Sequence, residues 1–145
     1  MNAGQIFSLA NALAVLGWLL LIFGGRTRWA APMVAGAVLP LLFAVIYSGL
    51  LVGHLVGSNG SFQTLAGVSA LFENRWLLLA GWVHYLAFDL FIGAWQVRDS
   101  RVRGISHLLV VPCLALTFLF GPAGLLLYFF IRVAHKHRKG LVIEI

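Results

Sequence analysis

Residues 82–99 read WVHYLAFDLFIGAWQVRD, and this stretch decides the fold class. Most of it is apolar or aromatic, as a helix embedded in lipid requires. His84 and Asp89 nevertheless lie inside it, well before the charged pair Arg98 and Asp99. A carboxylate at that depth costs about 2.5–3.5 kcal/mol on insertion scales, so its presence needs an explanation in packing or in function.

The composition of the whole chain indicates an integral membrane protein. Of its 145 residues, 61% are hydrophobic and 10% are charged, and the mean hydropathy is +0.98. Soluble domains carry about 25% charged residues, and a chain of this length could not hide so much apolar surface from water. The net charge of +6 therefore favours anionic lipid headgroups as partners, and no nucleic acid is expected.

Four apolar segments are long enough to cross a bilayer core, which needs about 20 residues of helix. They run over residues 3–24, 31–56, 76–97 and 105–132. Together they predict an all-α fold, a polytopic membrane four-helix bundle that forms a single domain over residues 1–145. A cleaved signal peptide is not expected, because the basic residues follow the first apolar run and do not precede it.

Features within and between these segments refine the prediction. Residues 58–75 are too polar to span a membrane, but apolar side chains recur there at helical spacing. This pattern predicts a short interfacial helix between the second and third spans, with a lid as a second possible role. Three prolines are expected to kink their helices: Pro40, Pro112 and Pro122. Pro122 also frees the carbonyl group of Phe118, which then needs another partner or water.

Glycines and basic residues give further expectations. Gly49, Gly53 and Gly57 recur every fourth residue, which favours close helix contact; room for a flat ligand is the alternative. Residues 24–29, a glycine pair followed by two arginines and a tryptophan, are expected to end the first span and anchor it at the interface. The basic tail, residues 133–145, is expected to contact anionic lipid headgroups.

The basic residues do not determine the orientation if all four segments cross the membrane. Both termini then lie on one side, and the ten lysines and arginines divide five against five between the two sides. The positive-inside rule gives no preference from such a tie.

The polar residues inside the third span are the first candidates for a site. Tyr85 lies one helical turn before Asp89 on the same face, whereas His84 lies about 140° around the helix from Asp89. His84 and Asp89 could still line two walls of one cavity if other helices enclose them. Bonding between helices is the competing role, because polar side chains also hold membrane helices together.

The fourth span supplies the second set of candidates. Antiparallel packing against the third span would bring His107 near the Gln96 end and Arg132 near the Trp76 end. Asp89 would then lie near the Pro112 kink or the Gly121-Pro122 break. As with the third span, holding helices together is the competing role for His107.

A metal site is a weaker alternative. Two intramembrane histidines and one aspartate could supply three ligands, but their spacing is no recognised ligand pattern. The chain also contains no GxGxxG motif, P-loop or nucleophile elbow. We therefore expect neither a metal nor an organic cofactor.

One pattern of aromatic, small and ionisable residues extends through the third and fourth spans. It consists of Trp82, His84, Tyr85, Asp89, Gly93, Trp95 and Asp99, followed by His107, Thr117-Phe118, Gly121-Pro122, Gly124, Tyr128 and Arg132. This pattern resembles the ABA-deficient-four-like family, small multi-span membrane proteins of plants, algae, cyanobacteria and other bacteria. The likeness is strongest over residues 76–132.

The resemblance implies a carotenoid connection, since the plant member is needed to convert violaxanthin into neoxanthin in plastid membranes. For this chain, which shows no transit peptide, we expect a multi-pass protein of a bacterial inner membrane. It would act on, or bind, a carotenoid or another isoprenoid lipid.

Opening an epoxide needs one proton given to oxygen and another taken from carbon. Asp89, kept protonated by burial, is the candidate general acid, and His84 or His107 is the candidate base. Aromatic side chains would stack along a polyene, and polar ones would orient its end group. These candidate substrate-binding residues are Trp82, Tyr85, Phe88, Trp95, Tyr128 and Arg132.

Two other functions fit the same residues. A non-catalytic pigment-binding or membrane-complex assembly protein would use His84 to ligate a chlorophyll-type magnesium or to bound a polyene. A small transporter or proton-conducting unit would use the polar line through the third and fourth spans. It would need a homo- or hetero-oligomer, since four helices leave little room for a pathway.

Overall fold

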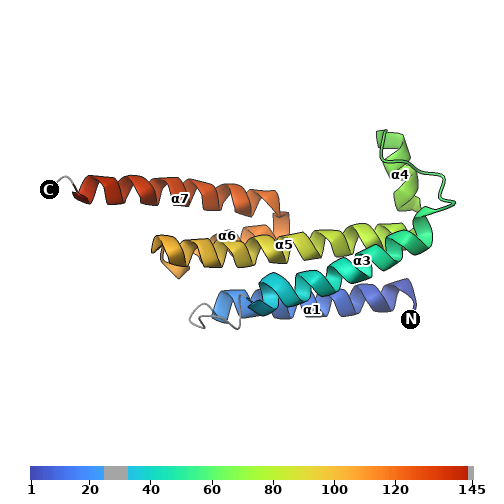
Figure 1. The fold of residues 1–145 in the computed structure, drawn as a ribbon, viewed down its shortest axis with the longest axis horizontal. Coiled ribbons are helices and arrows are strands. Elements are labelled where there is room, and N and C mark those ends of the chain that lie inside the picture. Colours follow the sequence, from blue (N-terminus) through green and yellow to red (C-terminus); the bar gives the residue numbers. More distant parts are fainter. Residues whose placement is uncertain (25–32, 144–145) are drawn as a thin grey trace.

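The computed structural model describes residues 1–24 and 33–143, and every regular element in these residues is helical (Figure 1). Three helical segments are long and apolar enough to cross a membrane, and they correspond to the first three predicted spans. The all-α class is confirmed, but a bundle of four complete spans is not. The elements are α1 (Ala3–Phe23), the π-helix η2 (Val34–Val38), α3 (Leu39–Leu55), α4 (Leu65–Glu73), α5 (Arg75–Arg103), α6 (His107–Phe120) and α7 (Pro122–Ile143).

The helix α1 is mostly apolar and begins with a capping box. The backbone N–H of Gln5 donates to Oδ1 of Asn2, and the backbone N–H of Asn2 donates to Oε1 of Gln5, both at 2.9 Å. These bonds satisfy amide groups that have no partner within the helix. The predicted end of this span at residues 25–29 lies outside the described residues, which stop at Gly24 and resume at Met33.

The central element is α5, which contacts every other helix. Two glycines allow α1 to approach it closely. A Cβ atom at Gly93 would lie 2.8 Å from the ring of Trp18, and one at Gly17 would lie 2.9 Å from Leu90. Because Trp18 and Leu90 are buried, this contact forms a tight part of the core.

The second predicted span is a π-helix followed by an α-helix. Pro40 lies in the first turn of α3, directly after η2. A proline has no amide hydrogen, and its ring clashes with the carbonyl group four residues earlier. The irregularity expected at Pro40 therefore takes the form of the wider π-helical turns.

The short helix predicted within residues 58–75 is confirmed as α4. Thr64 caps its beginning, since its hydroxyl group accepts a hydrogen bond from the backbone N–H of Gly67 at 3.0 Å. The third span is longer than predicted and continues to Arg103, which pairs with Asp99 one turn earlier at 2.9 Å. It ends at Gly104, whose φ of 68° is left-handed.

The fourth predicted span, residues 105–132, is not one helix. Gly121, with φ 47° and ψ −98°, ends α6, and Pro122 opens α7, which turns back along α6 (Figure 1). A proline is well suited to the first helical position, where its missing amide hydrogen has no cost. We call this pair of helices, residues 107–143, the α6–α7 hairpin.

The hairpin corrects two predictions. Arg132 was expected near Trp76, but α7 runs back and places its Nε atom 3.1 Å from Asp99. The beginning of α1 and the end of α7 also lie at opposite ends of the molecule, whereas four complete spans would have placed both termini at one end (Figure 1). We name the two ends after α5: the Arg75 end, where α1 and α5 begin, and the Asp99 end.

The glycine ridge of α3 does not mediate a helix contact within the described chain. A Cβ atom added at Gly49 or Gly53 would meet nothing within 4 Å. Gly57 lies beyond α3 in a left-handed turn, with φ 86° and equally open space around it. The prediction of close packing at these glycines is therefore wrong for contacts among the described residues.

Candidate functional site

The tip of the α6–α7 hairpin lies beside Asp89, at the midpoint of α5. A Cβ atom at Gly121 would be 3.1 Å from Oδ1 of Asp89, so the carboxyl group faces the bare backbone of the break. Asp89 is only 9% exposed, and its Oδ2 atom has no hydrogen-bond partner among the described residues. Of the two places expected for Asp89, the Pro112 kink and the Gly121-Pro122 break, the structure shows the break.

Tyr85 joins this tip from the same face of α5. Its hydroxyl group donates a hydrogen bond to the carbonyl oxygen of Phe118 at 3.1 Å. This is the carbonyl group that Pro122 leaves without its helical donor, and the expected need for a partner is met. Deeper along the hairpin, the amide nitrogen of Gln96 donates to the hydroxyl group of Thr117 at 3.1 Å.

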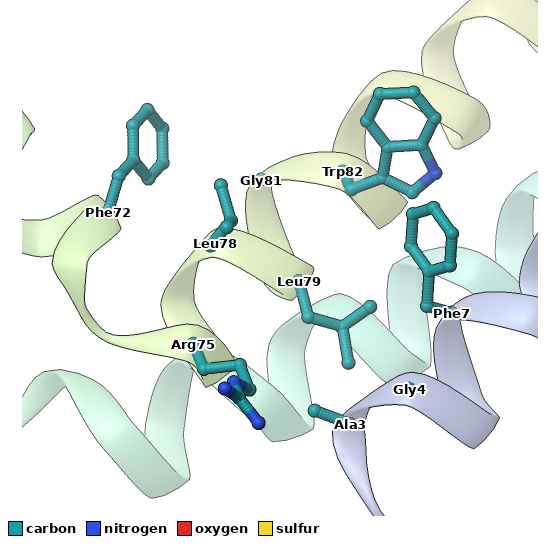
Figure 2. Close-up of a pocket in the computed structure, with 9 residues that line it drawn as sticks. All are labelled: Ala3, Gly4, Phe7, Phe72, Arg75, Leu78, Leu79, Gly81 and Trp82. Atoms are coloured by element: carbon teal, nitrogen blue, oxygen red, sulfur yellow. The ribbon is translucent and has the colours of Figure 1, made fainter.

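A groove lies between α1, α4 and α5, toward the Arg75 end (Figure 2). The α6–α7 hairpin does not extend along this part of α5 (Figure 1). Its volume is about 530 Å³. The walls are mostly aliphatic and aromatic, and Arg75 is the one charged side chain among the lining residues. These are Ala3, Gly4, Phe7, Phe72, Arg75, Leu78, Leu79, Gly81 and Trp82.

Trp82 connects this groove with the hairpin tip. Its ring lies 5.6 Å from that of Phe7 across the groove and 5.4 Å from that of Tyr85 along α5, between ring centroids. Its indole N–H donates to Oδ1 of Asn11 at 2.9 Å, which fixes the ring between α1 and α5. The stripe Arg75, Trp82, Tyr85 and Asp89 therefore leads from the mouth of the groove to the buried carboxyl group.

His84 lies on another side of α5. It lines a second pocket of about 290 Å³ between α3, α4 and α5. Its ring packs against Tyr47 at 5.3 Å and against Phe88 at 4.6 Å. Phe88 also lines a third pocket, of about 390 Å³, together with residues of η2 and α3. The structure therefore does not bring His84 and Asp89 to one cavity.

His107 is also separate from the hairpin tip. Its Nε2 atom is 2.9 Å from the carbonyl oxygen of Ile22, a contact that ties the beginning of α6 to the last turn of α1. The length of α6, roughly 20 Å at 1.5 Å per residue, lies between His107 and Gly121. The three candidate catalytic residues thus occupy three different places.

A polar cluster at the Asp99 end was not predicted. The hydroxyl group of Tyr128 donates to Oδ2 of Asp99 at 2.7 Å, and the guanidinium groups of Arg103 and Arg132 lie 2.9 and 3.1 Å from the same oxygen. The guanidinium group of Arg132 also packs over the ring of Trp95 at 5.9 Å. Tyr128, Arg132 and Trp95 therefore gather around Asp99, at the opposite end of the molecule from the groove.

One sequence signal could have revealed this cluster. Asp99 is one of only four acidic residues, and a glycine followed by proline is as typical of a new helix beginning as of a kink. A helix that restarts at Pro122 and turns back carries Tyr128 and Arg132 to Asp99.

The described residues contain no group of three or more side chains that could hold a metal ion.

These features define a class: a small protein whose described elements are all helical, with three helical segments of membrane-spanning length among them and a helical hairpin beside these segments. Residues 5–128 match the model of the family described as ABA DEFICIENT 4-like, and the chain belongs to this family. The resemblance drawn from the sequence is thereby confirmed. No curated protein and no solved structure matches the chain.

Proposed function

We propose that this membrane protein binds a carotenoid or another isoprenoid lipid in the groove between α1 and α5, and that it isomerises the bound lipid with Asp89 as the acid. The observation that carries the proposal is that the α6–α7 hairpin extends along only about half of α5. Because the hairpin stops beside Asp89, the remaining half of that face of α5 stays open as an apolar groove.

The groove suits a ligand with a long apolar body. Phe7 and Trp82 offer flat rings to a conjugated chain, and the other walls are mostly aliphatic. Arg75 lies at the outer end and can donate to a hydroxyl group. About 21 Å of helix, 14 residues at 1.5 Å each, separates Arg75 from Asp89.

The chemistry is an isomerisation that needs no redox partner. Asp89 would donate its proton to the oxygen of an epoxide end group as the carbon–oxygen bond breaks. The carboxylate so formed would then take a proton from the neighbouring carbon, and the electrons of that carbon–hydrogen bond would form a carbon–carbon double bond. This restores the acid and leaves an unsaturated alcohol. Because His84 and His107 lie elsewhere, one carboxyl group would serve both transfers. Tyr85 would position the end group between the groove and Asp89.

The test has two arms on the full-length protein, purified in mild detergent with an added epoxy-carotenoid. Gly4→Leu fills the groove, and Gly49→Leu adds the same side chain to open space on α3 as a matched control. We expect Gly4→Leu to lose the bound visible absorption band and Gly49→Leu to retain it. Equal binding by both variants would exclude the groove.

The second arm concerns Asp89. Asp89→Asn keeps the shape of the side chain but removes the transferable proton. We expect a bound pigment spectrum like that of the unmodified protein, with conversion of the carotenoid, followed by chromatography, reduced at least a hundredfold. Full conversion by the variant would remove Asp89 from the chemistry.

One observation favours a second candidate, non-catalytic pigment binding or a role in assembly. Asp89 lines none of the three pockets, and Tyr85 lies between it and the groove. A protein of this kind would hold one pigment per chain and leave an epoxy-carotenoid unchanged. The same two measurements therefore separate the two functions.

A further inference from the structure

The α6–α7 hairpin changes how positive charge is distributed between the two ends of the molecule. With α7 folded back, Arg132 lies beside Asp99, at the end where α5 also carries Arg98, Arg101 and Arg103. Among the side chains that the structure describes, Arg75 is the one lysine or arginine at the opposite end. Among the described residues, four basic side chains therefore lie at the Asp99 end and one lies at the Arg75 end.

The last turns of α7 add to this asymmetry. The helix continues to Ile143 and extends beyond the Asp99 end of α5 (Figure 1). Its sequence there includes Lys136, Arg138 and Lys139. With these residues, seven of the eight lysines and arginines counted lie at the Asp99 end and one lies at the Arg75 end, whereas four complete spans would have divided the same eight residues three against five.

We infer that the Asp99 end faces the cytoplasm, where its basic residues contact the anionic phospholipid headgroups of that leaflet, and that the beginning of α1 faces the opposite side. Basic residues near the ends of spans are retained on the cytoplasmic side, whereas acidic residues contribute little to orientation. Each lysine or arginine near an anionic surface also adds about 1 kcal/mol of attraction.

This orientation goes beyond the proposed function and stands independently of it. The α6–α7 hairpin enters the membrane from the cytoplasmic side, reaches Asp89 at mid-depth and returns to the same side. The groove beside Arg75 then opens toward the outer leaflet. A lipid ligand would enter from that leaflet.

The experiment uses reporters on the full-length chain in a bacterial host. Green fluorescent protein fluoresces when it folds in the cytoplasm and does not fluoresce when it is exported unfolded. Alkaline phosphatase is active only outside the cytoplasm. We expect C-terminal fusions to fluoresce and to lack phosphatase activity, and N-terminal fusions to show the reverse. Both termini on one side, or the opposite pair of sides, would overturn the inference.

A second variant tests whether charge sets the orientation. Asn59→Arg and Gln63→Arg add positive charge to exposed positions between α3 and α4, and Lys136→Gln, Arg138→Gln and Lys139→Gln remove it from the tail. We expect the ratio of phosphatase activity to fluorescence at the C-terminus to rise at least twofold. The matched control carries Asn59→Glu and Gln63→Glu, and in the tail it exchanges lysine and arginine for each other, which conserves their charge. An equal ratio in both variants would overturn the role of charge.

Discussion

The hydroxyl group of Tyr85 lies 3.1 Å from the carbonyl oxygen of Phe118, the acceptor that Pro122 deprives of its helical donor. A membrane offers no water to a carbonyl group at this depth. One side chain of α5 therefore satisfies the backbone at which α6 ends. This relationship explains how a helix can stop in the middle of an apolar structure.

Replacing Tyr85 with phenylalanine should leave that carbonyl group without a donor. We expect Tyr85→Phe to lower the free energy of unfolding by about 1 kcal/mol, the net value of one hydrogen bond. Equilibrium unfolding in mixed micelles of sodium dodecyl sulfate measures this loss. An unchanged unfolding midpoint would show that another group satisfies Phe118.

The backbone of Gly121 gives a second prediction. Its φ of 47° and ψ of −98° are strained for any residue with a side chain, and a Cβ atom would press on Asp89 at 3.1 Å. We expect Gly121→Ala to cost roughly 1–3 kcal/mol of stability. Gly53→Ala is the control, because its Cβ atom would meet nothing within 4 Å and alanine favours a helix. Equal effects in the two variants would contradict the strained break.

The cluster around Asp99 supplies the third prediction. Tyr128 is fully buried, and its hydroxyl group donates to a carboxylate at 2.7 Å. We expect Tyr128→Phe to lower the free energy of unfolding by about 1.5 kcal/mol or more, because a hydrogen bond to a charged group is lost. Thermal unfolding followed by circular dichroism measures it. Tyr47→Phe should have a smaller effect, since Tyr47 forms no side-chain hydrogen bond within the described residues.

The contact between α1 and α5 supplies the fourth. A methyl group at residue 93 would lie 2.8 Å from the buried ring of Trp18. We expect Gly93→Ala to destabilise the protein by about 1–3 kcal/mol through overpacking. Adding Trp18→Leu to this variant should cost less than Trp18→Leu costs alone. Strictly additive losses would show that the two positions do not touch.

The first three spans could be predicted because the length of an apolar run is read directly from the sequence. The break at Gly121 and the orphaned carbonyl group of Phe118 were also predictable, since both follow from the covalent chemistry of proline. So was the family: the residues that suggested it lie in the third and fourth spans, and the family model matches residues 5–128. Each of these features depends on neighbours along the chain.

The direction of the chain after the break was not predictable in the same way. It depends on contacts across the hairpin, where Gly124 lies so close to Thr117 that no side chain would fit between them. The positions of His84 and His107 depend equally on which helices surround α5. For these reasons Asp89, the candidate acid, was placed correctly beside the break. The candidate bases, His84 and His107, lie elsewhere in the structure.

In the proposed orientation, the α6–α7 hairpin would also give the protein unequal cross-sections in the two leaflets of a bilayer. One leaflet would surround three helices, whereas the other would surround these three and both arms of the hairpin. In that placement the protein would be wedge-shaped and would displace more lipid from one monolayer than from the other. Such a wedge fits best where the membrane curves, with the wider end in the monolayer of larger area.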